Sequence, residues 1–272
     1  MYLVKGLILL VTSVGALFFS LPFLWMLSTA VKPPYEVWVM PPKWIPSSIS
    51  FRNFVEPWDY LPFLTFYRNT VTVVIVTMIG TLTSSSLVAY GFARLRFPGR
   101  GILFVILLST MMLPAHITLI PLYLLYTWVG WVNTLLPLTV PSFFGAAFNI
   151  FLLRQFIMTI SPELDDAARI DGASYFGIYS RIVLPLIKPA LGVVAIFSFT
   201  YHWNDFLHPL IYLNSTKWFT IALGLRLIQS RTDIQIQYTM AMTVVSLIPV
   251  LTVFFLAQRY FIQGIVVTGI KG

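Results

Sequence analysis

Three residues that could hold a metal ion lie close together in an otherwise apolar stretch, the run Tyr201-His202-Trp203-Asn204-Asp205-Phe206-Leu207-His208-Pro209-Leu210. Imidazole and carboxylate groups are common ligands of divalent metals, so His202, Asp205 and His208 suggest a metal site. The spacing disfavours one, because residues i and i+6 lie far apart around a helix axis. A membrane metalloenzyme built on these residues and His116 remains an alternative, which metal analysis of the pure protein would decide.

A second polar segment, from Ser161 to Pro189, is suited to docking and needs no reactive groups. Ser161 and Pro162 fit the cap and the first position of a helix. Three acids then lie near the positive end of its dipole: Glu163, Asp165 and Asp166. We therefore predict a short helix here, with the acids on other faces than Leu164, Ala167 and Ala168, whose narrow, small-residue face can enter a groove on a partner.

The same segment continues into a turn and a second short helix. Gly172 can supply the left-handed conformation that ends the first helix. Ile178 and Ile182 then share one face of the next. An ordinary amphipathic helix between two membrane spans is the alternative interpretation.

The intervals in this segment resemble the EAA loop of ABC importer permeases. In that pattern Glu-Ala-Ala is followed after three residues by Gly, and after nine more by Ile-x-Leu-Pro. Here Asp166-Ala167-Ala168 precede Gly172, and Ile182-Val183-Leu184-Pro185 completes the pattern, with Asp166 where Glu is usual. The loop docks on the ATPase subunits in that family. The resemblance therefore implies such a contact for Glu163, Asp166, Ala167, Ala168, Gly172, Ile182, Leu184 and Pro185.

Composition places the chain in a membrane. Of its 272 residues 58% are hydrophobic and 10% are charged, and a soluble surface of that composition would be far too apolar for water. Absence of cysteine excludes disulfides and thiolate metal sites. The net charge of +8 would fit nucleic acid, but the basic residues are scattered over loops between apolar segments. We therefore expect no nucleic-acid partner.

Six apolar windows are long enough to span a bilayer, which needs ~20 residues each. They are residues 6–29, 69–93, 102–126, 135–157, 189–212 and 238–257. With the amino terminus inside, ten Lys and Arg residues lie inside and seven outside, as the positive-inside bias favours. Only this orientation puts the EAA-like loop in the cytoplasm, and it puts both termini there too.

The resemblance implies an all-α integral membrane protein, with six transmembrane helices of the type I ABC importer permease fold, in the cytoplasmic (inner) membrane of a prokaryote. We expect three regions. Residues 1–68 hold the first span and a proline-rich external loop, residues 69–258 form the permease domain, and residues 259–272 form a cytoplasmic tail.

The run around His202 also resembles the Trp-Asn-Glu/Asp-Phe-Leu-x-Pro-Leu motif in the fifth span of carbohydrate ABC importer permeases. Ionisable residues at membrane depth tend to face a cavity or another subunit, because facing lipid costs several kcal/mol. Our hypothesis is that the translocation cavity is lined by Trp203, Asn204, Asp205 and Phe206. For Asp205, holding helices together by hydrogen bonds is an equal alternative.

Two further segments match the family. The basic turn Arg94-Leu-Arg-Phe-Pro-Gly-Arg100 fits its Ala-Arg-x-x-Phe-x-Gly-Arg/Lys pattern, and orienting the protein is a sufficient role for it. The tail from Gln258 to Gly272 is too glycine-rich for a helix and too apolar for a solvated end. It resembles the tail of the second permease in maltose-type importers, which inserts between the ATPase subunits. The implied contacts are Gly264, Gly269, Lys271 and Gly272.

The resemblance, which covers essentially the whole chain, implies a permease subunit of a binding-protein-dependent ABC importer that moves a sugar or oligosaccharide by alternating access. Its implied partners are a sister permease in a heterodimer, two ATPase subunits, an extracytoplasmic solute-binding protein and the lipid bilayer. The chain has no Gly-x-x-x-x-Gly-Lys-Ser/Thr phosphate loop. We therefore expect no enzyme activity and no cofactor here, with ATP and Mg in the partners. A permease for a glycerol phosphoester or polyamine stays open.

Overall fold

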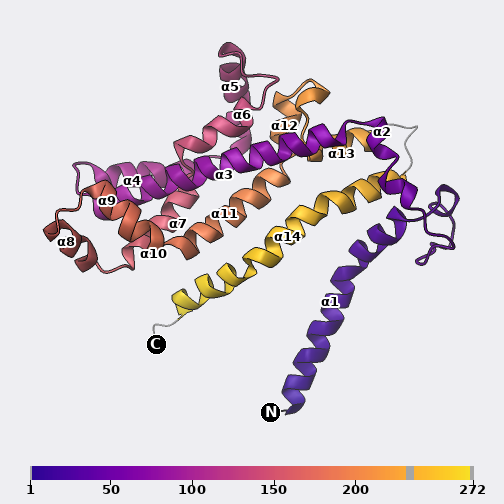
Figure 1. The fold of residues 1–272 in the computed structure, drawn as a ribbon, viewed down its shortest axis with the longest axis horizontal. Helices are drawn as coiled ribbons and strands as arrows, with labels where there is room; N and C mark the ends of the chain where they lie inside the picture. Colours follow the sequence, from indigo (N-terminus) through magenta and orange to yellow (C-terminus); the bar gives the residue numbers. More distant parts are fainter. Residues whose placement is uncertain (1, 231–235, 270–272) are drawn as a thin grey trace. The chain divides into compact units, whose positions relative to one another are not determined.

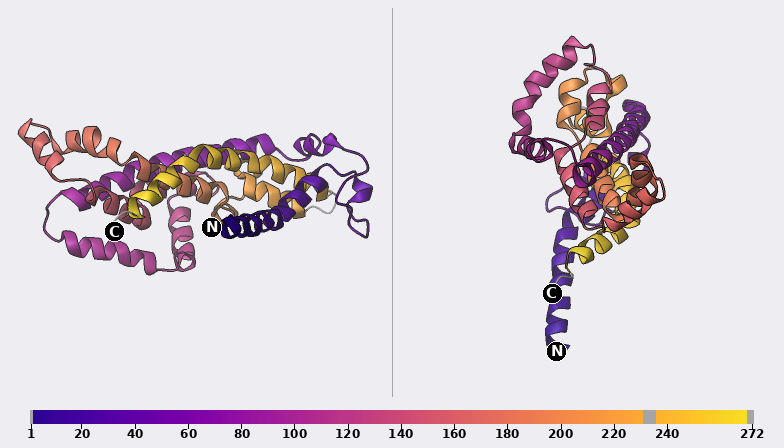
Figure 2. Two further views of the ribbon diagram at one scale, coloured as in Figure 1. Left: turned by 90° about the horizontal axis from the view of Figure 1, so that it is seen from below. Right: turned by 90° about the vertical axis from the view of Figure 1, so that its left-hand side faces the viewer.

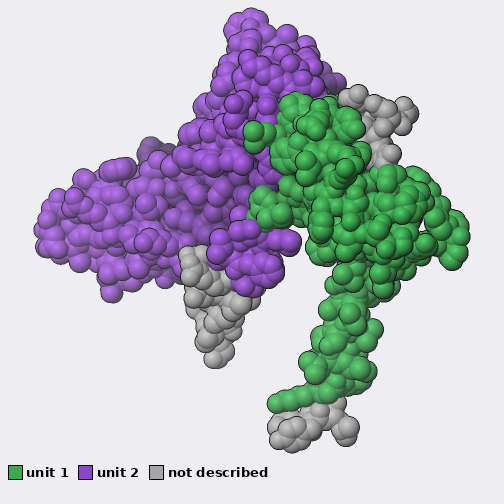
Figure 3. Space-filling view, turned by 45° about the vertical axis from the view of Figure 1, so that its right-hand side comes forward, with its two compact units in different colours: residues 1–64, 223–249 green, residues 65–222, 250–272 purple. Residues whose placement is uncertain are grey.

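The computed structural model describes residues 2–230 and 236–269, and every regular element among them is a helix (Figure 1). The prediction of an all-helical chain is confirmed for this part. The chain forms two compact units, coloured separately in Figure 3. Unit 1 comprises Met1–Leu64 with Leu223–Pro249, and unit 2 comprises Thr65–Ala222 with Val250–Gly272.

Four helices of the described residues are long and apolar enough to cross a membrane: Val4–Ala30, Phe63–Arg94, Leu136–Met158 and Ile236–Gln258. Two bent helix pairs raise the number to six if each pair is one span. The first pair, Arg100–Met112 with His116–Trp128, bends by 101°, and the second, Tyr175–Leu186 with Lys188–Trp203, by 77°.

Unit 1 starts with α1 (Tyr2–Ala30), whose end is tied to the irregular segment that follows. That segment contains only short turns: η1 (Pro34–Glu36), η2 (Phe51–Phe54) and α2 (Pro57–Tyr60). The buried Asn53 amide donates to the carbonyls of Ala30, at 2.9 Å, and Lys32, at 2.8 Å. These buried polar contacts order a loop that has little regular structure of its own.

Two buried charges lie in the same loop. Hydrogen bonds from the Ser47 side chain and backbone hold the pKa of the Glu36 carboxyl below its usual value. The Lys32 ammonium lies 3.8 Å from the centre of the Trp25 ring, a cation–π contact. Burial lowers the pKa of the Lys32 amino group, and the negative charge of Glu36 opposes that shift.

Unit 2 is built around α3 (Phe63–Arg94) and holds most of the remaining helices, seen from two further directions in Figure 2. In chain order they are α4 (Arg100–Ser109), η3 (Thr110–Met112), α5 (Ala115–Trp128), α6 (Leu136–Thr139), η4 (Val140–Phe144), α7 (Ala147–Met158), α8 (Glu163–Ile170), α9 (Tyr175–Ile178), η5 (Tyr179–Val183), α10 (Leu184–Leu186), α11 (Lys188–Trp203), α12 (Leu207–Tyr212) and η6 (Thr216–Trp218). The remaining helices are α13 (Ile221–Ser230) and α14 (Ile236–Gly269), and the boundary between the two units falls within each of them, after Ala222 and after Pro249.

The largest group of buried apolar residues in unit 2 joins elements far apart in the sequence. It brings Ala89 and Tyr90 of α3 together with Leu153 of α7, Ala168 of α8 and Val194 of α11. α7 also packs against α4 and α11. The polar segment from Ser161 onward is therefore anchored on the membrane helices of its own unit.

Two predicted spans are not continuous helices. Residues 102–126 break at Leu113 and Pro114, because proline lacks an N–H and forces the residue before it into an extended conformation. Residues 189–212 break after Trp203, where α11 ends. Asp205 then accepts the backbone N–H of His208 at 3.3 Å in the first turn of α12. The predicted windows 102–126 and 189–212 are therefore bent pairs of helices, so whether each is one span depends on counting each pair as a single crossing.

The tail also differs from the prediction. α14 continues as a helix to Gly269, so Gly264 and Gly269 belong to it, whereas Lys271 and Gly272 lie outside the described residues. A glycine inside a helix costs only about 1 kcal/mol. Extending an existing helix avoids the unfavourable nucleation step, so one glycine does not end it.

Gly80 of α3 is where this helix most closely approaches η4. A Cβ atom at this position would lie 2.8 Å from the Phe143 ring and closer still to the Ser142 hydroxyl. One turn further along, the Ser84 hydroxyl donates to the Ser142 carbonyl at 3.0 Å. The absence of a side chain at position 80 therefore sets the distance between α3 and η4.

We predict that Gly80→Ala destabilises the protein, while Gly91→Ala on the same helix does not. Both changes gain up to about 1 kcal/mol of helix propensity, and a Cβ at Gly91 meets open space. At Gly80 overpacking of about 1–3 kcal/mol outweighs that gain. Thermal unfolding of the purified permease in detergent measures the difference. Equal melting temperatures for the two variants would contradict the close approach.

Candidate functional site

The segment from Ile160 to Val183, here named the coupling segment, begins with a short capped helix. The Ser161 hydroxyl accepts the N–H of Glu163 at 3.3 Å, and α8 starts there. Gly172 ends the helix with φ = +79°, as the sequence predicted. The N–H of Gly172 donates to the Arg169 carbonyl at 3.0 Å, and that of Ala173 to the Ala168 carbonyl at 2.9 Å. This is the Schellman pattern, which satisfies the last carbonyls of α8.

One face of α8 is buried against its own unit. Asp165 and Ala168, three residues apart, are both buried. The Asp165 carboxylate pairs with the Arg94 guanidinium, Oδ2 to Nε 3.2 Å, with only 6% and 8% of the two side chains exposed. Arg94 also donates to the Ile160 carbonyl at 2.8 Å. Ala168 therefore shares the buried face with Asp165, which corrects the expectation that it lies with Leu164 and Ala167 on a face apart from all the acids.

The opposite face of α8 is open. Leu164 is 45% exposed and Ile170 is 87% exposed, and Glu163, Asp166 and Ala167 are exposed beside them. In the following helix Phe176 is 68% exposed. Apolar side chains gathered on a polar segment mark an interaction surface. These residues form a face that a partner can cover.

The second helix of the segment contains an irregularity that the sequence did not indicate. Ser174 caps α9 by accepting the Gly177 N–H at 3.1 Å. A π-helical turn, Tyr179–Val183, follows. Because its hydrogen bonds run from i to i+5, Val183 is buried together with Ile178. The predicted partner Ile182 is only half-buried.

The remaining residues of the EAA-like pattern lie just beyond this turn. Ile182 and the half-buried Leu184 pack against the core of unit 2, while Pro185 is exposed. Ile182 and Leu184 are therefore packed within the permease itself, and any contact they make with a partner would be made from these packed positions.

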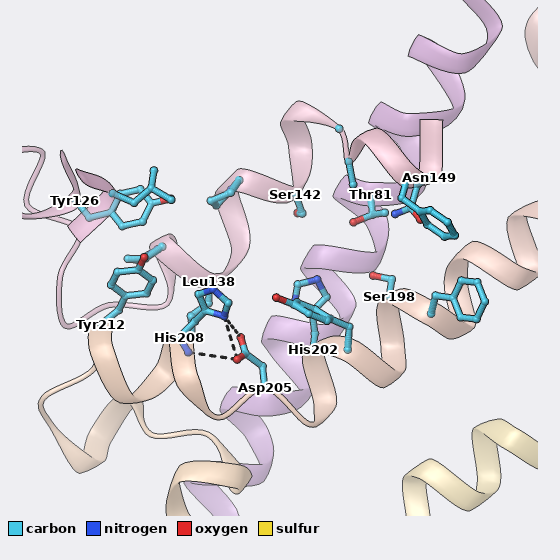
Figure 4. Close-up of a pocket in the computed structure, with 18 residues that line it drawn as sticks. Thr81, Tyr126, Leu138, Ser142, Asn149, Ser198, His202, Asp205, His208 and Tyr212 are labelled. Atoms are coloured by element: carbon cyan, nitrogen blue, oxygen red, sulfur yellow. Dashed lines mark hydrogen bonds and ion pairs between the residues drawn. The ribbon is translucent and has the colours of Figure 1, made fainter. Parts of the chain in front are cut away.

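A pocket of about 590 Å³ opens elsewhere in unit 2, between α3, the α6–η4 segment, α11 and α12 (Figure 4). Tyr126, Tyr201 and Tyr212 are among its lining residues. The rings of Tyr126 and Tyr212 meet edge to face, with their centres 5.2 Å apart. Two buried hydroxyls among its lining residues, Ser198 Oγ and Tyr212 Oη, make no hydrogen bond within the described residues. Both oxygen atoms are almost fully covered, so a hydrogen bond to a ligand would require these side chains to turn toward the pocket.

Of the four residues predicted to line a cavity, Asp205 lines this pocket. It pairs with His208, Oδ2 to Nδ1 2.9 Å. Trp203 is buried and stacks on Phe199, Phe206 is half-buried, and Asn204 is exposed with its amide bonded to the Thr200 carbonyl at 2.8 Å. Residues 2–230 and 236–269 contain no cluster of three or more metal-ligating side chains that could hold a metal.

Residues 82–267 match the protein family described as the binding-protein-dependent transport system inner membrane component. The chain belongs to this family. A probable ABC transporter permease of Bacillus subtilis, YurM, is 33% identical over 258 residues, covering 92% of this chain and 83% of that protein. The arabinooligosaccharide permease AraQ of Halalkalibacterium halodurans is 35% identical over 228 residues, covering 84% and 81%.

Two further relatives bear on solute and fold. The sn-glycerol-3-phosphate permease UgpE of Rhizobium meliloti is 36% identical over 202 residues, covering 74% of this chain and 71% of that protein. A crystal structure of a bacterial ABC transporter that imports alginate contains a chain with the same fold, at a TM-score of 0.86 and 23% identity, covering 95% and 96%.

The protein is a multi-pass permease subunit of a binding-protein-dependent ABC importer. It is a transport component that works with ABC and binding-protein partners, as its family indicates.

We predict that Gly172→Val disrupts the end of α8, whereas Gly172→Asn preserves it. Nothing lies within 4 Å of a Cβ atom at this position, so the whole penalty is backbone strain at positive φ. A β-branched residue is strongly disfavoured there, while Asn adopts this conformation more readily. ATP hydrolysis stimulated by the binding protein should fall for Val and persist for Asn in the assembled transporter. Equal activity of the two variants would show that the turn is not needed.

Proposed function

We propose that this chain is the permease of a carbohydrate importer that crosses the membrane six times, with both termini in the cytoplasm. Besides the four long helices, each bent helix pair is counted as one crossing, the third and the fifth in chain order. This orientation puts the coupling segment inside, where ATPase subunits can reach it, and the loop after α1 outside, where a solute-binding protein can. A sister permease completes a heterodimer, as the family resemblance implies.

The pocket chemistry supports a neutral sugar as the solute. Aromatic rings offer flat apolar faces, and Asn149, Asp205 and His208 add polar side chains to the lining. Its volume falls within the ~300–1,000 Å³ of small-molecule sites. None of the eighteen residues drawn in Figure 4 as lining it is Lys or Arg, and Asp205 is their one carboxylate. A phosphate-bearing solute would meet no Lys or Arg side chain among them.

The relatives support a carbohydrate without deciding its charge. One is named for arabinooligosaccharides, and the structurally similar transporter imports the acidic polysaccharide alginate. Another is named for sn-glycerol-3-phosphate, which keeps a phosphoester as the second candidate. The absence of Lys and Arg from the described pocket favours the sugar.

The coupling segment is proposed to bind the ATPase through its open face, with Leu164, Asp166, Ala167 and Ile170 in the contact. Asp166 forms only a long, exposed ion pair with Arg169, at 3.7 Å, so it is free to meet a basic group on the partner. The end of the chain is proposed to reach the ATPase pair as well, through Gly264 and Gly269 of α14 and through Lys271 and Gly272, which lie outside the described residues.

We predict that Asp205→Asn and Tyr201→Ala each lower sugar uptake, while the neighbouring Asn204→Ala does not. Asp205→Asn removes the charge that strengthens a hydrogen bond, and Tyr201→Ala removes an aromatic face; each costs about 0.5–1.5 kcal/mol, or roughly 2- to 10-fold in uptake. Uptake of a labelled neutral oligosaccharide and of sn-glycerol-3-phosphate should be measured in proteoliposomes containing all subunits. The yield of assembled complex is the control for folding. Transport of the phosphoester alone would contradict the proposal, as would equal uptake by all variants.

A further inference from the structure

Three polar residues of α3 follow one another at intervals of four and lie on one side of the helix: Ser86, Tyr90 and Arg94. Each bonds to a different part of the coupling segment. The Ser86 hydroxyl meets the Tyr179 hydroxyl at 2.8 Å, and the Tyr90 hydroxyl donates to the Tyr175 carbonyl at 3.2 Å. Three successive turns of α3 thus hold the π-turn, the start of α9 and, through Arg94, the start of α8.

Arg94 makes the most demanding of these contacts. It binds the Asp165 carboxylate and the Ile160 carbonyl together, so it fixes both α8 and the residue that leads into it. A buried charge left without its partner is costly, so the pair strongly favours the geometry seen here. A loop that only oriented the protein in the membrane would not require its arginine to be buried.

The contacts made by Ser86 and Tyr90 lie within the apolar core of unit 2. Ser86 and Tyr90 are 1% and 5% exposed, and the rings of Tyr90 and Tyr179 lie 5.4 Å apart. Because these hydroxyls are buried, water could not take the place of a lost hydrogen bond. The two contacts therefore favour one position of the coupling segment along α3 over neighbouring positions.

The same helix touches the pocket. Thr81 of α3 lines it, and Gly80 and Ser84 contact the η4 residue Ser142, which lines it too. From Thr81 to Arg94 the unbroken helix rises about 20 Å. A displacement of α3 against the pocket wall would therefore carry the coupling segment with it.

We propose that Ser86, Tyr90 and Arg94 are positioning residues that fasten the coupling segment to α3, so that α3 links the state of the pocket to the surface offered to the ATPase. The inference rests on the coupling role proposed above. It assigns a transport role to the basic turn, for which orientation in the membrane had been a sufficient explanation.

The test compares Arg94→Met and Tyr90→Phe with Arg68→Met, an exposed arginine near the other end of α3. In the complete transporter, the number of solute molecules imported per ATP hydrolysed should fall for the first two variants and stay unchanged for the control. Amide hydrogen exchange of residues 163–178 should rise roughly 2- to 150-fold, the range that corresponds to coupling energies between contacting residues. Tyr90→Phe removes one hydroxyl only and keeps the experiment informative if Arg94→Met does not assemble.

A double-mutant cycle with Asp165→Asn separates positioning from general stability. Once Arg94 is Met, Asp165→Asn should add little further loss of coupling, and Arg94→Lys should restore part of it. Normal import per ATP together with normal exchange in Arg94→Met and Tyr90→Phe would overturn the proposal. If Gly172→Val uncouples transport while these variants do not, only the fastening by α3 fails. If Gly172→Val is also fully coupled, the role of the segment itself is wrong.

Discussion

The ion pair between Arg94 and Asp165 is the contact on which the geometry of the coupling segment depends. Both side chains are almost fully buried, and the arginine also holds the carbonyl that precedes α8. Two opposite charges withdrawn from water tolerate little change in separation. Because α8 has only eight residues, it would be marginal as an isolated helix. Its packing on α3 therefore decides where it lies.

That anchoring divides α8 into two faces with different roles. Asp165 and Ala168 face the permease, and Leu164 and Ile170 face outward. The Schellman turn at Gly172 then redirects the chain into α9 without using either face. The segment is thus fixed on α3 and still presents an apolar surface, which is the combination that the proposed contact with the ATPase requires.

The start and the end of α8 could be predicted from the sequence, because each depends on residues that are close together in the chain. Glycine at position 172 is the residue type that a left-handed helix end favours, and Ser161 is a cap residue type. Apolar length identified the membrane helices. The partner of a buried charge is not local: Arg94 lies 71 positions before Asp165, and nothing in either neighbourhood pairs them. Two features of the sequence could have suggested this pair: an acid within the first turn of α8, and an arginine at the end of a long apolar helix.

Other features were missed because tertiary packing overrode spacing. The π-turn moves Val183 to the place where helical periodicity puts Ile182. The break after Trp203 turns Asp205 into the pocket while leaving Asn204 outside it, although the two are adjacent. The pocket itself draws on residues from α3 to α12, α5 and α7 included, so no single motif could reveal its aromatic walls.

The division of α8 into an anchored and an open face can be measured directly, because the chain contains no cysteine that would interfere. Single cysteines at Ile170 and at Ala168 should be tested for cross-linking to the ATPase subunit in the assembled transporter, with yields compared under identical conditions. Cross-linking at position 170 with little or none at position 168 is the result that this structure predicts. Equal cross-linking at both positions, or cross-linking at 168 alone, would show that α8 does not sit on α3 as described.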